Sequence, residues 1–152
     1  MKALFIITSA LLMNFFNLTT TLPGKPELHY DGLYLAKTGE LNIPNKKMDI
    51  YNYIRFYKDG TVYTQSVTAN DPEKISKWFG KDGRFERKGT YKLEGAVLNF
   101  SVTNDESPDK SIEGAMKDSY TGKITNDGKL QLEVKYESGT VKEFTFEYVK
   151  TN

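Results

Sequence analysis

Apolar and polar residues alternate in short segments along most of the chain beyond residue 30. In Lys129–Tyr136, for example, every second residue is apolar or aromatic, and Gln, Glu and Lys stand between them. This period of two is typical of β-strands with one buried and one solvent-facing side. We predict eight strands rich in aromatic, β-branched and leucine residues: Leu33–Lys37, Ile50–Tyr57, Thr61–Thr68, Arg84–Leu93, Ala96–Thr103, Ser111–Ile124, Lys129–Tyr136 and Thr140–Val149.

Turn sequences separate these segments at short intervals. Asp-Gly occurs at 31–32, 59–60, 82–83 and 127–128, and Glu94-Gly95 and Ser138-Gly139 supply further turns. Dense turns of this type indicate antiparallel hairpins. The expected fold class is therefore all-β, an eight-stranded antiparallel up-and-down barrel, because closure removes unpaired strand edges. A two-sheet sandwich is the alternative, but it needs longer crossover connections.

One stretch between the third and fourth strands departs from alternation. Asp71-Pro72-Glu73 offers a helix N-cap, a proline at the first helical position and an early acid, and Gly80 offers a C-cap. Ile75, Trp78 and Phe79 have the i, i+3, i+4 spacing of one helix face. We predict one short helix over Pro72–Phe79, with Trp78 pressed onto an apolar surface.

The N-terminal segment resembles an export signal rather than part of a barrel. Lys2 precedes an apolar run, Ala3–Phe16, which is shorter than the roughly 20 residues that span a bilayer. We expect a signal peptide at 1–22, a flexible N-terminal remnant at 23–30 and a barrel domain at 31–150. A buried N-terminal helix is the alternative. The expected product is exported, periplasmic or secreted, with no stable membrane span after processing.

Composition narrows the function classes. The 152 residues include no Cys and one His, and 21 basic against 20 acidic side chains leave a net charge of +1. A near-neutral chain has no overall field to attract nucleic acid, so no nucleic-acid partner is expected. Without Cys the protein must depend on its core rather than on disulfides.

Two motifs resemble the lipocalin family. Asp31-Gly32-Leu33-Tyr34 is similar to the G-x-W opening of lipocalins, with Tyr34 in place of Trp, and a long loop is expected after it at Thr38–Asp49. The stretch Tyr53–Val62 looks like the strand-turn-strand of bacterial lipocalin-like domains, and also like the barrel-like part of certain F-box proteins. The short helix lies between the third and fourth strands instead of after the eighth, so ligand preferences of lipocalins do not carry over. The resemblance implies an eight-stranded barrel over residues 31–149.

The predicted barrel interior suggests a binding site. A three-residue loop at Lys58-Asp59-Gly60 would pair Phe56 with Val62 on the inner face. A barrel of eight strands holds either packed side chains or one small ligand. Inward glycines at 89, 114 and 122 would either leave a hollow or relieve strand bending. The hypothesis is an exported binding protein for a small, mostly apolar molecule, with these ligand-binding candidates: Ile54, Phe56, Arg87, Tyr91, Phe100, Gly114, Met116, Asp118, Tyr120, Leu132 and Phe146.

Arg87 and Asp118 break the apolar inner pattern. A polar pair in an otherwise apolar pocket can orient a carboxylate or amide of a ligand. The alternatives are a rim position, a bulge that turns the side chains outward, or an ion pair with no ligand.

Catalysis has little support in the residues. The single His29 lies in the expected remnant, so a Ser-His or Cys-His nucleophile is not expected. The acidic loop Asn104–Lys110 lacks the spacing of a calcium loop, and zinc lacks Cys or a second His. We therefore expect a protein that is not an enzyme, with no metal and no cofactor.

A second hypothesis places the function on the outside of a solid barrel. Tyr51, Tyr53, Arg55, Tyr57 and Tyr63 are expected on the outer face of one hairpin. Tyr and Arg are enriched at protein interfaces, although Tyr also favours exposed strands in general. The alternative function is a secreted interaction or assembly module that binds a protein through Tyr53, Arg55, Tyr57 and Tyr63.

Overall fold

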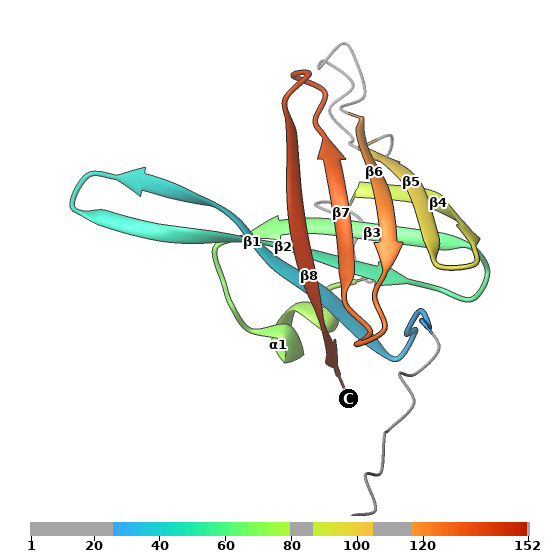
Figure 1. Cartoon of the computed structure of the whole chain (residues 1–152). Coiled ribbons are helices and arrows are strands. Elements are labelled where there is room, and N and C mark those ends of the chain that lie inside the picture. The colour runs from blue at the N-terminus through green and yellow to red at the C-terminus, as the bar shows by residue number, and fades with distance from the viewer. Residues whose placement is uncertain (1–25, 80–86, 105–116, 152) are drawn as a thin grey trace, which may run out of the picture.

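The computed structural model describes residues 26–79, 87–104 and 117–151, which form a closed barrel with one short helix (Figure 1). Each strand pairs antiparallel with the next, and the first pairs with the last. The predicted all-β, eight-stranded up-and-down barrel is therefore confirmed. The elements are β1 Gly32–Ile43, β2 Lys46–Phe56, β3 Thr61–Val67, α1 Pro72–Ser76, β4 Arg87–Glu94, β5 Val97–Thr103, β6 Asp118–Ile124, β7 Leu130–Lys135 and β8 Val141–Lys150.

The β2–β3 hairpin has the predicted register. Phe56 pairs with Val62 and Ile54 with Thr64, and all four side chains are buried. The Tyr57 N–H donates to the Thr61 carbonyl at 2.9 Å, which closes the three-residue loop. Gly60 adopts φ +90°, a left-handed conformation that glycine tolerates without steric cost.

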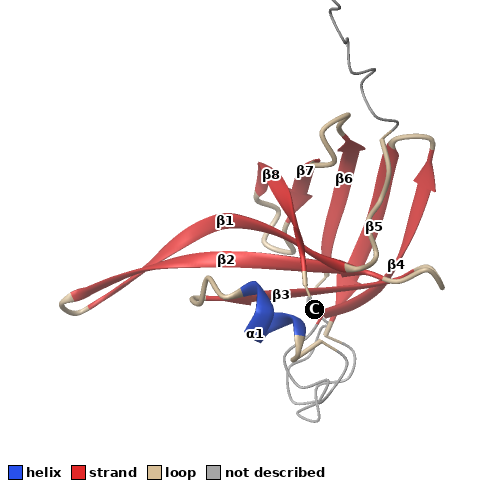
Figure 2. Ribbon diagram, turned by 90° about the horizontal axis from the view of Figure 1, so that it is seen from below, coloured by secondary structure: helices blue, strands red, loops and turns tan. Residues whose placement is uncertain are grey.

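The predicted long loop at Thr38–Asp49 is wrong. β1 and β2 continue through this stretch as a two-stranded ribbon that projects away from the barrel (Figures 1 and 2). Ile43 pairs with Lys46, so Pro44 and Asn45 form the two-residue turn, with Asn45 at φ +63°. Apolar residues alternate with polar or charged ones on both strands, and this strand-like alternation explains why a ribbon forms instead of a loop.

The helix forms where predicted but is shorter. Asp71 caps it by accepting from the Lys74 N–H at 3.1 Å, and Pro72 occupies its first turn. The helix ends at Ser76, so Trp78 and Phe79 lie beyond it and do not share a helix face with Ile75. Ile75 and Phe79 are buried, but Trp78 is 42% exposed, and the prediction that Trp78 presses the helix onto the barrel is wrong. The Lys74 ammonium lies 5.6 Å from the centre of the Trp78 ring instead.

Helix α1 covers the outer face of the first strands. Leu33 and Tyr53 point away from the barrel interior and form a second small core with Ile75 and Phe79. All four are nearly inaccessible to solvent. Both faces of β1 and β2 are thus buried where α1 covers them (Figure 2).

Two of the inward glycines serve the bending of the sheet. A Cβ atom at Gly89 would lie 1.8 Å from the Ser101 carbonyl oxygen, and one at Gly122 would lie 1.9 Å from that of Gln131. No side chain fits in such a contact, so these glycines permit neighbouring strands to twist past each other closely. Gly114 lies outside the described residues.

Candidate functional site

One end of the barrel is closed by the residues that precede β1. Leu28 is 3% exposed and belongs to the main core, and the His29 ring stacks on Tyr148 with centroids 4.2 Å apart. The Tyr91 hydroxyl donates to the Tyr57 carbonyl at 3.0 Å and lies 3.3 Å from the Tyr30 hydroxyl. The segment 23–30 was expected to be a flexible remnant, and the structure packs its last residues against the barrel from Leu28 onward.

Aromatic rings fill the middle of the barrel. Phe56 meets Tyr34, Tyr91 and Phe100 edge to face at centroid distances of 5.8, 5.1 and 5.5 Å. Phe100 in turn stacks on Tyr120 at 4.4 Å. Such contacts add to the free energy gained by apolar burial. Phe56, Phe100 and Tyr120 were proposed as ligand contacts, and in this structure they contact one another.

A polar pocket lies at the opposite end of the barrel from Leu28. Its volume is about 190 Å³, and it is lined by Asn52, Thr64, Gln65, Ser66, Arg87, Asn104 and Tyr120. The strand register places Asn52, Thr64, Ser66 and Arg87 on the same inner face, whereas Gln65 shares the outer face with Tyr53. The polar groups of this pocket therefore come from β2, β3, β4 and β6, and from Asn104, which follows β5.

Asn52 has the most informative surroundings in the pocket. Its side chain is 4% exposed and donates from Nδ2 to the Tyr120 hydroxyl at 3.1 Å. Its Oδ1 is buried without a hydrogen-bond partner among the described residues. An unsatisfied buried acceptor costs about 1–3 kcal/mol, which a donor from a bound molecule would recover. Asn52 Oδ1 can therefore accept a hydrogen bond from an N–H or O–H group that enters the pocket.

Burial raises the pKa of the Tyr120 hydroxyl to about 12. The side chain is 1% exposed, and desolvation disfavours its charged form. The hydroxyl therefore stays protonated at neutral pH and can both donate and accept hydrogen bonds in the pocket.

Arg87 and Asp118 form an ion pair at this end of the barrel. The Asp118 side chain is almost fully buried, and its Oδ1 also accepts from the Glu137 N–H at 3.3 Å. Among the alternatives weighed for these two inward residues, the structure therefore shows the ion pair. Among the described residues that line the pocket, Arg87 is the one charged side chain, and the Asp118 carboxylate offsets its charge.

The remaining ligand-binding candidates are distributed between core and pocket. Of the eleven proposed residues, Arg87 and Tyr120 line the polar pocket, and Asp118 is paired with Arg87. Ile54, Phe56, Phe100, Leu132 and Phe146 belong to the buried core, and Tyr91 packs against it. Gly114 and Met116 lie outside the described residues.

Asn52, Thr64 and Ser66 were not among the predicted ligand-binding residues, although the alternation that places Ile54 and Phe56 inside also places these polar residues inside. That periodicity was the available sign of a polar end to the barrel.

A larger hollow of about 680 Å³ lies over β5–β8 outside the core. Its walls are mainly exposed side chains such as Thr121, Lys123, Gln131 and Glu133. In the lining of this hollow the structure shows no buried polar atom without a partner. We therefore place the candidate site in the smaller polar pocket.

Some of the residues predicted to form an outer interaction surface make contacts within the chain instead. Tyr53 is buried beneath α1 and donates to the Ala69 carbonyl at 3.0 Å, and Arg55 donates to the Ser76 carbonyl at 3.1 Å. Tyr57 and Tyr63 meet edge to face at 5.5 Å and are half-buried. A partner would have direct access to Tyr57 and Tyr63 but not to Tyr53.

Within 26–79, 87–104 and 117–151, no group of three or more His, Asp or Glu side chains is placed to hold a metal ion. The same residues contain no helix with the length and hydrophobicity needed to cross a membrane. Comparisons of the chain with protein-family models, with curated proteins and with solved structures found no match.

Proposed function

We propose that this protein is a lipocalin-like binding barrel that holds a small, uncharged, hydroxyl-bearing molecule in the polar pocket. The observation that carries the proposal is the buried Asn52 Oδ1, which has no partner among the described residues and lines the pocket. The hydroxyls of Thr64, Ser66 and Tyr120 line the same pocket and can donate or accept. A polyol or a single sugar unit offers matching groups of both kinds.

Pocket size and charge support this ligand class. A volume of about 190 Å³ corresponds to roughly six water molecules at about 30 Å³ each. This is below the roughly 300–1,000 Å³ of sites for drug-sized molecules. The Arg87–Asp118 pair contributes no net charge, so a charged ligand would gain little from it. The mostly apolar ligand expected from the sequence would need apolar walls, and the described walls are polar.

The test is a titration followed by NMR, with glycerol, glucose and inositol as polar probes and laurate as the apolar probe. We expect saturable shifts at Asn52, Thr64 and Tyr120 with at least one polar probe. The Asn52→Leu variant should bind about tenfold more weakly or worse, since one hydrogen bond and one buried acceptor are lost. Asn99→Leu is the matched control, because Asn99 is exposed on the outside of β5.

Two outcomes would contradict the proposed ligand class. Saturable binding of laurate alone would favour the apolar ligand, and equal binding by the Asn52→Leu and wild-type proteins would remove Asn52 from the site. Thermal unfolding of both variants shows whether a loss of binding reflects a loss of fold.

We also propose that the protein is exported and acts by binding rather than catalysis. The supporting feature is the apolar run Ala3–Phe16 after Lys2, which lies outside the described residues. The expected result is an intact mass, in protein recovered from outside the cytoplasm of its host, that corresponds to cleavage near residue 22. Recovery of the full-length chain from the cytoplasm alone would contradict export.

A further inference from the structure

The two-stranded ribbon that projects from the barrel has two open edges. We call residues 38–50 the arm. β1 pairs with β8 only over Gly32–Leu35, and β2 pairs with β3 only from Tyr51 onward. No other strand among the described residues borders the arm on either side. An isolated hairpin is marginally stable, and an open strand edge is a template for pairing with another strand.

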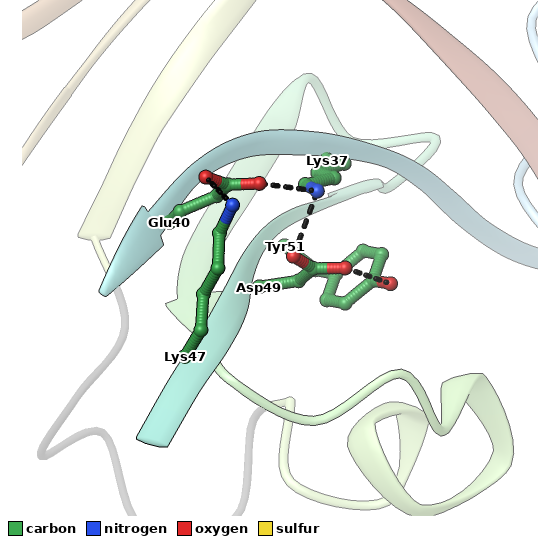
Figure 3. A network of polar contacts seen from close by, with 5 residues as sticks. All are labelled: Lys37, Glu40, Lys47, Asp49 and Tyr51. Atoms are coloured by element: carbon green, nitrogen blue, oxygen red, sulfur yellow. Dashed lines mark hydrogen bonds and ion pairs between the residues drawn. The ribbon is translucent and has the colours of Figure 1, made fainter. Parts of the chain in front are cut away.

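One face of the arm is mainly charged and the other mainly apolar. On the charged face Lys37 contacts Glu40 at 3.0 Å and Asp49 at 2.7 Å, and Lys47 contacts Glu40 at 2.6 Å (Figure 3). Hydrogen bonds from Lys47 and Lys37 lower the pKa of Glu40, so its carboxylate stays ionised at neutral pH. The opposite face carries Leu41, Ile43, Met48 and Ile50, together with the exposed Lys46 at the tip, and Leu41 and Ile43 are each 43% exposed.

The direction of the backbone groups on β2 follows from its pairing with β3. The Tyr57 N–H donates to Thr61, so the odd-numbered residues of β2 direct their N–H and C=O groups toward β3. The irregularity between Lys37 and Gly39 lies in β1, so β2 continues without interruption. Beyond Tyr51, where β3 ends, Asp49 and Lys47 therefore direct their backbone groups to the open edge.

We propose that this edge pairs with the same edge of a second copy of the chain, antiparallel about a two-fold axis at Met48. A two-fold pairing must set residues with outward backbone groups opposite each other. Pairing Lys47 with the partner's Lys47, or Asp49 with the partner's Asp49, opposes like charges and is unfavourable. With the axis at Met48, Lys47 lies opposite the partner's Asp49, and Asp49 opposite the partner's Lys47.

In this register each face of one arm continues into the same face of the partner's arm. Met48 meets the partner's Met48 on the apolar side, and Leu41 and Ile43 lie on the same side of the combined four-stranded sheet. On the other side, Asp49 gains a second lysine beside Lys37, so the ion pairs of Figure 3 continue from one copy into the next. The arm therefore has the self-complementary pattern that a symmetric dimer requires.

Sedimentation velocity over a range of concentrations tests the dimer. The samples are the chain without residues 1–22 and two charge variants of it. Asp49→Lys opposes lysine to lysine across the axis, and Lys47→Asp opposes aspartate to aspartate. We expect each variant alone to dimerise at least about tenfold more weakly than wild type. An equimolar mixture of the two variants restores opposite charges at every opposed position and should dimerise as wild type does.

Glu133→Lys, an exposed charge reversal on β7, is the matched control and should dimerise normally. A wild-type chain that is monomeric at all concentrations overturns the proposal. Dimers that persist in both single variants overturn the role of the arm. Dimers lost in both variants and not restored by mixing them overturn the register about Met48.

Discussion

Replacing Arg87 with methionine is expected to lower the free energy of unfolding by about 3 kcal/mol at neutral pH. Methionine keeps much of the length of the arginine side chain but leaves the Asp118 carboxylate without its cation. Asp118 is 4% exposed, and its remaining described hydrogen bond comes from the Glu137 N–H. A buried charge that loses its partner retains its full desolvation cost. Urea-induced unfolding followed by circular dichroism measures the change.

The neighbouring residue and a double variant provide the controls. Lys88 is exposed, so Lys88→Met should change stability by no more than about 0.5 kcal/mol. Adding Asp118→Leu to Arg87→Met should recover most of the loss, because an apolar pair often replaces a buried ion pair at little cost. If Arg87→Met were as mild as Lys88→Met, the ion pair would have no structural role, and orienting a ligand would again be its better explanation.

The barrel was predictable because its strands follow simple local rules. The alternation in Lys129–Tyr136 identified the buried side of β7, and the loop Lys58-Asp59-Gly60 fixed the register between Phe56 and Val62. In an up-and-down barrel each strand pairs with its sequence neighbour, so local turns determine most of the topology. Only the closure of β1 on β8 depends on distant residues.

The arm and Trp78 show where local patterns were misjudged. The resemblance to lipocalins suggested a long loop over Thr38–Asp49, yet Leu41, Ile43, Met48 and Ile50 alternate through it with a strand period. Trp78 has helical spacing from Ile75, but the helix stops at Ser76 and the ring turns to solvent. Where an element ends depends on tertiary contacts, which spacing along the chain does not reveal.

The character of the candidate site was only partly predictable. Alternation placed Arg87 and Asp118 inside the barrel, and the structure pairs them there. The same rule places Thr64 and Asn52 inside, but most of the inner face is apolar, and the ligand predicted from the sequence was therefore apolar. Which inner residues pack together and which line a pocket depends on how the aromatic rings fill the barrel. This filling depends on ring contacts of Phe56, Phe100 and Tyr120 between strands β2, β5 and β6, which are far apart in the sequence.

Replacing Gly122 with alanine is expected to lower the free energy of unfolding by about 2–3 kcal/mol, although only one methyl group is added. The new Cβ would lie 1.9 Å from the Gln131 carbonyl oxygen and 2.9 Å from the Leu132 Cα, so β6 and β7 must separate. Backbone atoms of a paired strand cannot rotate away as a flexible side chain can. The midpoint of thermal unfolding, compared with that of wild type, measures the loss.

Gly39→Ala is the matched control for this glycine. Its Cβ would meet only the Ile50 Cδ1 within 4 Å, at 3.8 Å, and its φ is not positive. An alanine there also restricts the unfolded chain, so stability should be unchanged or raised by up to about 1 kcal/mol. Equal effects of the two substitutions would mean that β6 and β7 have room to separate. The inward glycines would then mark space inside the barrel. A ligand too large for the polar pocket would in that case be the better proposal.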